Sequence, residues 1–245
     1  MPPSTLRALE DVILDAQRHF ADLLAHSLAT QRPSRDQYAR YLSFQYHLTR
    51  DVQSHLLAIA GHRELARRRK LREFLFRFAN EEELHYLVAA KDLSALGLAP
   101  LPISIDVELW HAYFWSILRE RPFVRLGAAA VIENISGGPA RDWLEKALRG
   151  DFLDRSNSNF IVLQRQASPP PGRQVLDALA GGSLKPRHFA DLVEGAHKAT
   201  VLYLRMVEWT LRPESVSRIC DASAATIGAI EARRIAEFDV RELVA

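Results

Sequence analysis

The sequence predicts an all-α protein. Apolar residues recur every three or four positions along nearly the whole chain, which is the spacing of amphipathic helices. Strand-like alternation bounded by hairpin turn signals does not occur in the sequence. The 245 residues, 48% hydrophobic and 25% charged, are enough to build a substantial core. We therefore expect a single helical-bundle domain over residues 1–245.

The first half of the chain predicts three long helices. The first is expected over Ser4–Ala29. The turn "RPSRDQY" follows, in which Ser34 and Gln37 have the spacing of a capping box. This pattern starts a second helix that ends near Gly61. The third helix is expected to run without interruption over Glu64–Gly97, where glycine provides a stop signal.

The second half of the chain contains two strong breakers. Arg121-Pro122 interrupts the helical pattern, and "ASPPPG" (167–172) is the clearest breaker in the sequence. The tail from Pro213 onwards (213–245) predicts one further, appended helix. Before, between and after these two breaks, helices are expected over residues 106–120, 123–134, 140–148, 153–166 and 186–211.

Composition narrows the classes of partner and compartment. The chain has 32 basic and 30 acidic residues, a balance of +2, which indicates neither nucleic acid nor an anionic membrane as the main partner. Its one cysteine, Cys220, excludes a disulfide framework and a cysteine-based zinc site. No apolar run approaches the roughly 20 residues that span a bilayer, and the N-terminal segment lacks the apolar core of a signal peptide. We expect a soluble cytoplasmic protein.

The acidic run in "FANEEELHYLVAAKDL" (78–93) divides between surface and core. At 100° per residue, Glu82 and His85 fall within the apolar stripe, and Asp92 lies on it further along. Glu81 is at its edge, whereas Glu83 faces solvent. A core-facing carboxylate is costly unless it is paired, protonated or bound to a cation. Glu-x-x-His is the arrangement of carboxylate-bridged di-iron bundles, but a buried Glu–His hydrogen bond explains the same pattern.

Further polar residues fall on apolar faces of the predicted helices. Gln45 and Thr49 occupy the middle of the second helix's stripe, and His197 lies at the flank of the stripe in the late helix. Glu133 lies at the edge of its stripe, one turn before Gly137-Gly138. Glycines there allow close approach of either a ligand or another helix, and the residues alone do not decide between them.

Three segments together resemble the heme-oxygenase-like superfamily: "PSRDQYARYLSFQYHLTRDV" (33–52), "EEELHYLVAAKDLSALG" (81–97) and "ENISGGP" (133–139). The resemblance covers roughly residues 10–210 and implies a heme-oxygenase-like bundle. The branch it resembles most is the non-heme, di-iron oxygenase-like one, which uses iron and dioxygen on a small molecule. The resemblance then implies iron ligands at Glu82, His85 and Glu133, with Glu81 or Asp92 as alternatives. It places Gln45, Thr49 and Gln164 around the substrate pocket, and the place of His197 on the late helix makes it a further residue at the pocket flank.

The sequence departs from that branch at its late ligands. The family's His-x-x-x-Asp-x-x-His falls on "LQRQASPPPG", where the ligand positions hold Gln164, Ser168 and Pro171. Proline has no side-chain donor, and Gln or Ser is a poor neutral substitute for an iron ligand. The ligand set for two irons is therefore incomplete.

The other branches of the superfamily match less well. The first-helix position of a heme ligand falls at Ala16–Gln17, and His19 comes nearly a turn late, so no heme is expected. The thiaminase-like branch needs a mid-chain cysteine and a second-helix carboxylate, whereas Cys220 is late and Gln45 holds the latter position. The pocket of the pyrroloquinoline-quinone synthase branch does not map onto this sequence.

Three functions stay open from the sequence. The first is an iron- and dioxygen-dependent oxidoreductase. The second is a degenerate, metal-free member that binds a ligand or serves as a partner protein in a biosynthetic pathway. The third is metal-free acid–base catalysis by Glu82 and His85. We also expect Trp110, Phe114 and Trp115 to be exposed aromatic residues on one helix face that would support a homodimer.

Overall fold

The computed structural model describes residues 4–29, 32–142, 151–166 and 170–213, and no strand occurs among them. This confirms the all-α class. The elements are α1 (Ser4–Leu28), α2 (Arg35–Thr49), α3 (Val52–Gly61), the 3-10 helix η1 (Arg63–Leu65), α4 (Arg69–Glu82), α5 (His85–Ala95), α6 (Ile105–Leu118), α7 (Pro122–Ile135), α9 (Asn159–Gln166), α10 (Pro171–Ala180) and α11 (Pro186–Leu211).

The strongest local signals are confirmed. The bounds of α1 and α11 agree with the expected helices to within one residue. The capping box at the start of α2 forms as predicted: Ser34 Oγ accepts from the Gln37 backbone N–H at 3.1 Å. In return, the Ser34 N–H donates to Gln37 Oε1 at 2.8 Å. Both otherwise unsatisfied amides at this helix end thus find partners within the motif.

Two helices expected to be continuous are each broken in the structure. The second is interrupted at Arg50–Asp51, between α2 and α3, and the third at Glu83–Leu84, between α4 and α5. Because α2 packs on α5 and α3 packs on α4, the two segments bend together. Apolar periodicity continues across both breaks, which is why the sequence pattern alone indicated uninterrupted helices.

The region around the expected breaker "ASPPPG" differs most from the prediction. The helix expected over 153–166 begins only at Asn159, because the Asp154 carboxylate accepts from the backbone N–H and hydroxyl of Ser156 in a local turn. The unpredicted α10 starts within the prolines. Pro171 occupies its first turn, where the missing N–H costs nothing. Residues 143–148 of the helix expected at 140–148, and the tail helix from residue 214, lie outside the described residues.

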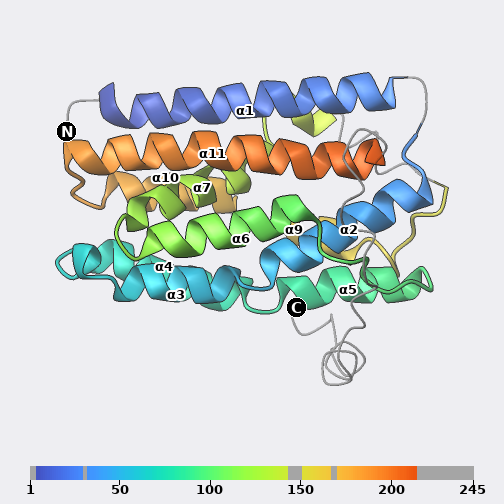
Figure 1. Ribbon diagram of the computed structural model, residues 1–245, viewed down its shortest axis with the longest axis horizontal. Coiled ribbons are helices and arrows are strands. Elements are labelled where there is room, and N and C mark those ends of the chain that lie inside the picture. The colour runs from blue at the N-terminus through green and yellow to red at the C-terminus, as the bar shows by residue number, and fades with distance from the viewer. Residues whose placement is uncertain (1–3, 30–31, 143–150, 167–169, 214–245) are drawn as a thin grey trace.

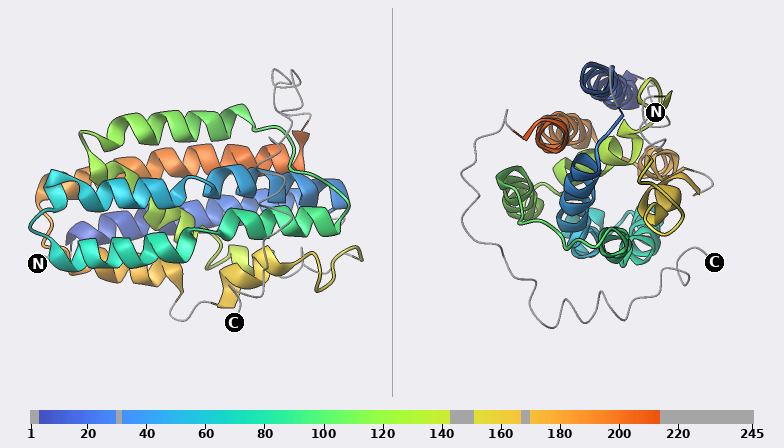
Figure 2. Two further views of the ribbon diagram at one scale, coloured as in Figure 1. Left: turned by 90° about the horizontal axis from the view of Figure 1, so that it is seen from below. Right: turned by 90° about the vertical axis from the view of Figure 1, so that its right-hand side faces the viewer.

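The long helices run along the length of the molecule, with α1 and α11 side by side (Figures 1 and 2). Helix α7 lies at the centre and packs on α11, α1, α10 and α6. Its residues 122–131 are all buried. In the described part of the chain, no helix is both long and apolar enough to cross a membrane.

Two glycines bring α7 and α11 into backbone contact. A Cβ atom at Gly127 would lie 2.0 Å from the Leu192 carbonyl oxygen. The reciprocal contact places a Cβ at Gly195 only 1.8 Å from the Val124 carbonyl oxygen. Real Cβ atoms do not approach backbone oxygens this closely, so the crossing requires glycine at both positions.

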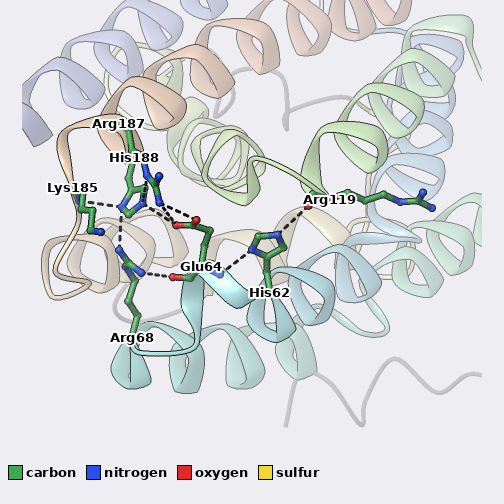
Figure 3. Close-up of polar contacts among 7 residues, drawn as sticks. All are labelled: His62, Glu64, Arg68, Arg119, Lys185, Arg187 and His188. Atoms are coloured by element: carbon green, nitrogen blue, oxygen red, sulfur yellow. Dashed lines mark hydrogen bonds and ion pairs between the residues drawn. The ribbon is translucent and has the colours of Figure 1, made fainter.

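A polar cluster joins the start of α11 to η1 and the start of α4 (Figure 3). Arg187 Nη2 donates to both carboxylate oxygens of Glu64, at 2.9 and 2.7 Å. Arg68 Nη2 lies 3.2 Å from Nδ1 of His188, whose ring stacks on Phe123 with centroids 4.1 Å apart. The cluster ties three elements together at the end of the bundle opposite the α2–α5 contact (Figure 1).

Candidate functional site

The bundle contains a cavity of about 590 Å³, lined mainly by α1, α2, α7 and α11 with further residues from α3, α4, α6, α9 and α10. A volume of this size matches the range of small-molecule pockets in proteins. Most of its wall is aromatic or aliphatic, including Phe20, Leu24, Leu56, Phe78, Trp110 and Val207. A few charged and polar side chains interrupt this apolar surface, and they define the candidate site.

Glu82 reaches the cavity wall from the end of α4. It is 6% exposed, and its Oε2 accepts a hydrogen bond from Nδ1 of His85 at 2.8 Å. The helix break at Glu83–Leu84 lies between the two residues. Even so, Glu82 and His85 are in contact, as expected for side chains on the same helix face. Among the described residues, Glu82 lines the cavity and His85 does not. The contribution of His85 to the site is therefore its hydrogen bond to Glu82.

Glu133 reaches the same cavity from α7. It is half-buried, and it lies on the cavity wall. Burial, followed by the negative charge of Glu82, raises the pKa of Glu133 well above its ordinary value, while Arg125 acts in the opposite direction. Glu82 and Glu133 therefore interact electrostatically across the cavity.

Arg125 is a buried cation of the cavity wall that the sequence patterns did not indicate. It is 3% exposed, and its Nε donates to Nδ1 of His55 at 3.2 Å. Its guanidinium carbon lies 5.7 Å from the ring centre of Trp110 and 5.8 Å from that of Phe114. Burial lowers the pKa of Arg125 to about 10. The available signal was a single charge within the apolar run "FVRLGAAAV" (123–131).

Gln45 and Thr49 line the cavity, as expected from their place on the apolar stripe. Gln45 Nε2 donates to the Tyr203 hydroxyl at 3.2 Å. Thr49 Oγ1 donates to the Gln45 carbonyl oxygen of its own helix at 2.7 Å. The hydroxyl of Thr49 is thus satisfied locally, whereas the amide of Gln45 links α2 to α11.

The alternative ligands Glu81 and Asp92 have other roles. Glu81 is exposed and lies 3.8 Å from Arg77 in a surface ion pair. Asp92 is fully buried and accepts from the Phe160 backbone N–H at 2.7 Å and from Asn159 Nδ2 at 2.8 Å. Asp92 therefore satisfies the start of α9 from a neighbouring helix, which is a structural function.

We expect Asp92→Ala to lower the free energy of unfolding by about 2–3 kcal/mol, because it leaves the buried Phe160 amide without an acceptor. Urea denaturation measures this change. Ligand binding in the cavity should be retained by the folded variant. A variant of wild-type stability would contradict the capping role.

The remaining expected site residues are not brought together. His197 is exposed on α11 and is not among the described residues of the cavity wall. It therefore does not lie at the flank of this pocket, where we expected it. The side chain of Gln164 and the whole of Ser168 lie outside the described residues. Pro171 does line the cavity, but it offers no ligand atom.

The first helix presents Gln17, not His19, to the cavity. The ring of His19 is exposed and bonds to the Asp15 carbonyl oxygen at 3.0 Å. Gln17 donates to the Asn134 carbonyl oxygen at 2.7 Å, and its Oε1 would lie 2.6 Å from a Cβ at Gly138. Gly138 has φ +53°, which favours glycine. The glycine pair therefore accommodates a side chain of α1.

Two of the three aromatic residues proposed for a dimer face are core residues. Trp110 and Phe114 are 2% and 0% exposed and belong to the hydrophobic core. The expectation that these two residues lie on an exposed helix face is wrong, because the helical stripe they share faces inward. Trp115 is 46% exposed, and its ring stacks on His55 with centroids 4.3 Å apart.

The residues around the cavity do not fit the iron centre that the resemblance implies. Glu82 and Glu133 supply carboxylates. However, Glu82 is hydrogen-bonded to His85, and the cation that acts on Glu133 is the side chain of Arg125. Pro171, which holds the position of the last histidine ligand in that branch, has no side-chain atom that could bind a metal. Within the described ranges, no group of three or more His, Cys, Asp or Glu side chains is arranged to hold a metal ion.

Comparison with known proteins supports the fold. No family model and no curated protein matches this chain. A solved domain of unknown function with a heme oxygenase-like fold, from Shewanella denitrificans OS217, superimposes with a TM-score of 0.67. The match covers 86% of this chain and 90% of that domain at 17% sequence identity. The chain therefore has the heme oxygenase-like fold.

Proposed function

We propose that this protein binds a small, mainly apolar molecule inside its helical bundle. The observation that carries the proposal is the cavity of about 590 Å³, whose apolar wall is interrupted by the charged side chains of Glu82, Glu133 and Arg125. An apolar pocket with a few polar groups is the usual form of a small-molecule site. The polar groups would orient a ligand that the apolar wall holds by burial.

A titration with the neutral fluorophore N-phenyl-1-naphthylamine tests this function. We expect saturable fluorescence enhancement at one molecule per chain. Ala129→Phe fills the cavity from α7, because Ala129 lies on its wall, and should weaken binding at least tenfold. Ala190→Phe adds the same ring on the exposed face of α11 and should bind like the wild type.

Circular dichroism establishes that both variants are folded. Failure of the wild-type chain to bind the fluorophore would overturn the proposal. Equal binding by folded Ala129→Phe would do so too, because the fluorophore would then occupy another place.

A second candidate function is an iron- and dioxygen-dependent oxidoreductase, with Glu82, His85 and Glu133 as ligands. The observation that favours it is that Glu82, which accepts a hydrogen bond from His85, also acts electrostatically on Glu133. Anaerobic addition of ferrous iron, followed by counting iron per chain, separates the candidates. We expect no stoichiometric iron; iron at one or two per chain that is lost in Glu82→Ala would establish the second candidate instead.

A further inference from the structure

Arg125 is a charged group whose burial is not explained by its contacts within the protein. A buried guanidinium is costly unless its charge and its donors are matched. Its one hydrogen bond within the described residues uses Nε, which donates to the neutral acceptor Nδ1 of His55. No carboxylate of the described chain forms an ion pair with it, although Glu133 influences its pKa through space. The terminal nitrogens of the guanidinium remain for another partner.

The contacts of Arg125 hold it in one orientation. His55 is itself 1% exposed and stacks on Trp115, so the acceptor of the Nε bond is fixed. The rings of Trp110 and Phe114 lie against the guanidinium. A guanidinium held by its Nε and by two rings is preorganised, and it presents its terminal N–H groups without further loss of side-chain entropy.

The space beside Arg125 is suited to a head group. Arg125, Ala129 and Glu133 follow one another at intervals of four residues on one face of α7, and all three line the cavity. A rise of 1.5 Å per residue separates the backbone positions of Arg125 and Glu133 by about 12 Å. The methyl group of Ala129 lies between them, so α7 itself leaves room for a small polar group there.

The charges of the cavity wall favour an anion. Its described basic residues are Arg125, Arg141 and Arg173, and its acidic residues are Glu82 and Glu133. Arg141 and Arg173 are exposed, and thus mark the surface end of the cavity, where Arg173 also pairs with Asp177 at 3.0 Å. The basic residue buried in the wall is Arg125, and a buried arginine binds anions with charge-assisted hydrogen bonds.

We propose that Arg125 binds the carboxylate of an otherwise apolar ligand in the space over Ala129. This inference rests on the ligand-binding function proposed above and adds the chemical class of the ligand. The carboxylate accepts from the terminal nitrogens of Arg125 in the bidentate geometry that guanidinium favours. The apolar body lies against the aromatic wall formed by Phe20, Phe78 and Trp110.

Calorimetric titration of the full chain with 4-phenylbutanoate and with its primary amide tests the inference. The two probes share the apolar body and differ in charge. We expect the carboxylate to bind the wild-type chain at least tenfold more tightly, because a charge-assisted hydrogen bond to the guanidinium is stronger than a neutral one to the amide. Arg125→Gln should remove this preference while retaining binding of the amide.

Two variants control for the loss of a positive charge. Arg69→Gln removes an arginine that is exposed and paired with Glu73 on α4, and it should keep the full preference for the carboxylate. Arg125→Lys keeps the charge but not the planar fork, and it should keep part of the preference. If Arg125→Gln does not fold, a reduced preference in folded Arg125→Lys still carries the test.

Equal binding of the two probes by the wild-type chain would overturn the inference and leave the general ligand-binding function intact. A preference that survives in folded Arg125→Gln would also overturn it. Absence of binding by both probes would refute the carboxylate class, and the neutral fluorophore would then report separately on whether the cavity binds ligands at all.

Discussion

Replacing Gly195 with alanine is expected to lower the free energy of unfolding by more than about 3 kcal/mol, at the upper end of overpacking effects. The added Cβ would lie 1.8 Å from the Val124 carbonyl oxygen. Backbone atoms cannot rotate away as a flexible side chain does, so α7 and α11 would have to separate. Because α7 carries Arg125 and Glu133, the same change should also weaken ligand binding.

Urea denaturation of Gly195→Ala and Gly61→Ala measures the effect against a matched control. Gly61 ends α3, and a Cβ there would meet no atom within 4 Å. We expect Gly61→Ala to be neutral or up to about 1 kcal/mol more stable, from helix propensity. If both substitutions changed stability by similar amounts, the close crossing of α7 and α11 would be incorrect.

Lowering the pH from 7 to 5 is expected to destabilise the protein by about 2 kcal/mol through His55 alone. Burial, then the charges of Arg125 and His111, lower the pKa of His55 from 6.5 to about 2. The unfolded chain therefore binds a proton below pH 6.5 that the folded chain does not bind. The stability that neutral, buried His55 provides is fully present above pH 7. It is lost progressively as the pH falls below the unfolded-state pKa of His55.

Comparison with His55→Gln isolates this contribution, because other groups titrate in the same range. His111 and His188, whose pKa values burial also lowers, act in the same direction as His55. Glu133 acts in the opposite direction, because its raised pKa makes the folded chain bind a proton before the unfolded one. We expect the variant to lose about 2 kcal/mol less than the wild type between pH 7 and 5. Parallel pH profiles of the two proteins would show that His55 is charged in the folded state.

Local sequence signals identified most helices but not their interruptions. The capping box of Ser34 and Gln37 and the extent of α11 are properties of neighbouring residues, so they could be predicted. The break at Glu83–Leu84 could not, because the apolar stripe continues through it. Helix α10 was missed because prolines that end one helix also suit the first turn of the next.

The candidate site was predictable in part for the same reason. Helical facing placed Gln45 and Glu82 inward and Glu133 at the edge of its stripe, and all three line the cavity. Facing could not show that Asp92 satisfies the start of α9, since its partner Phe160 lies 68 residues away. Nor could it show that His197 is exposed, because the flank of an apolar stripe faces either a cavity or solvent.

The sequence by itself determined that this chain forms a helical bundle, that Glu82 faces the interior and that Glu133 lies at the edge of its apolar stripe, because these follow from periodicity within single helices. Only the tertiary structure decided what those carboxylates meet. Glu82 meets His85 across a helix break, and Glu133 shares its cavity with Arg125, whose positive charge acts on the Glu133 carboxyl. Such neighbours are set by the crossing of helices distant in sequence, and a glycine contact as close as that of Gly195 with Val124 fixes that crossing.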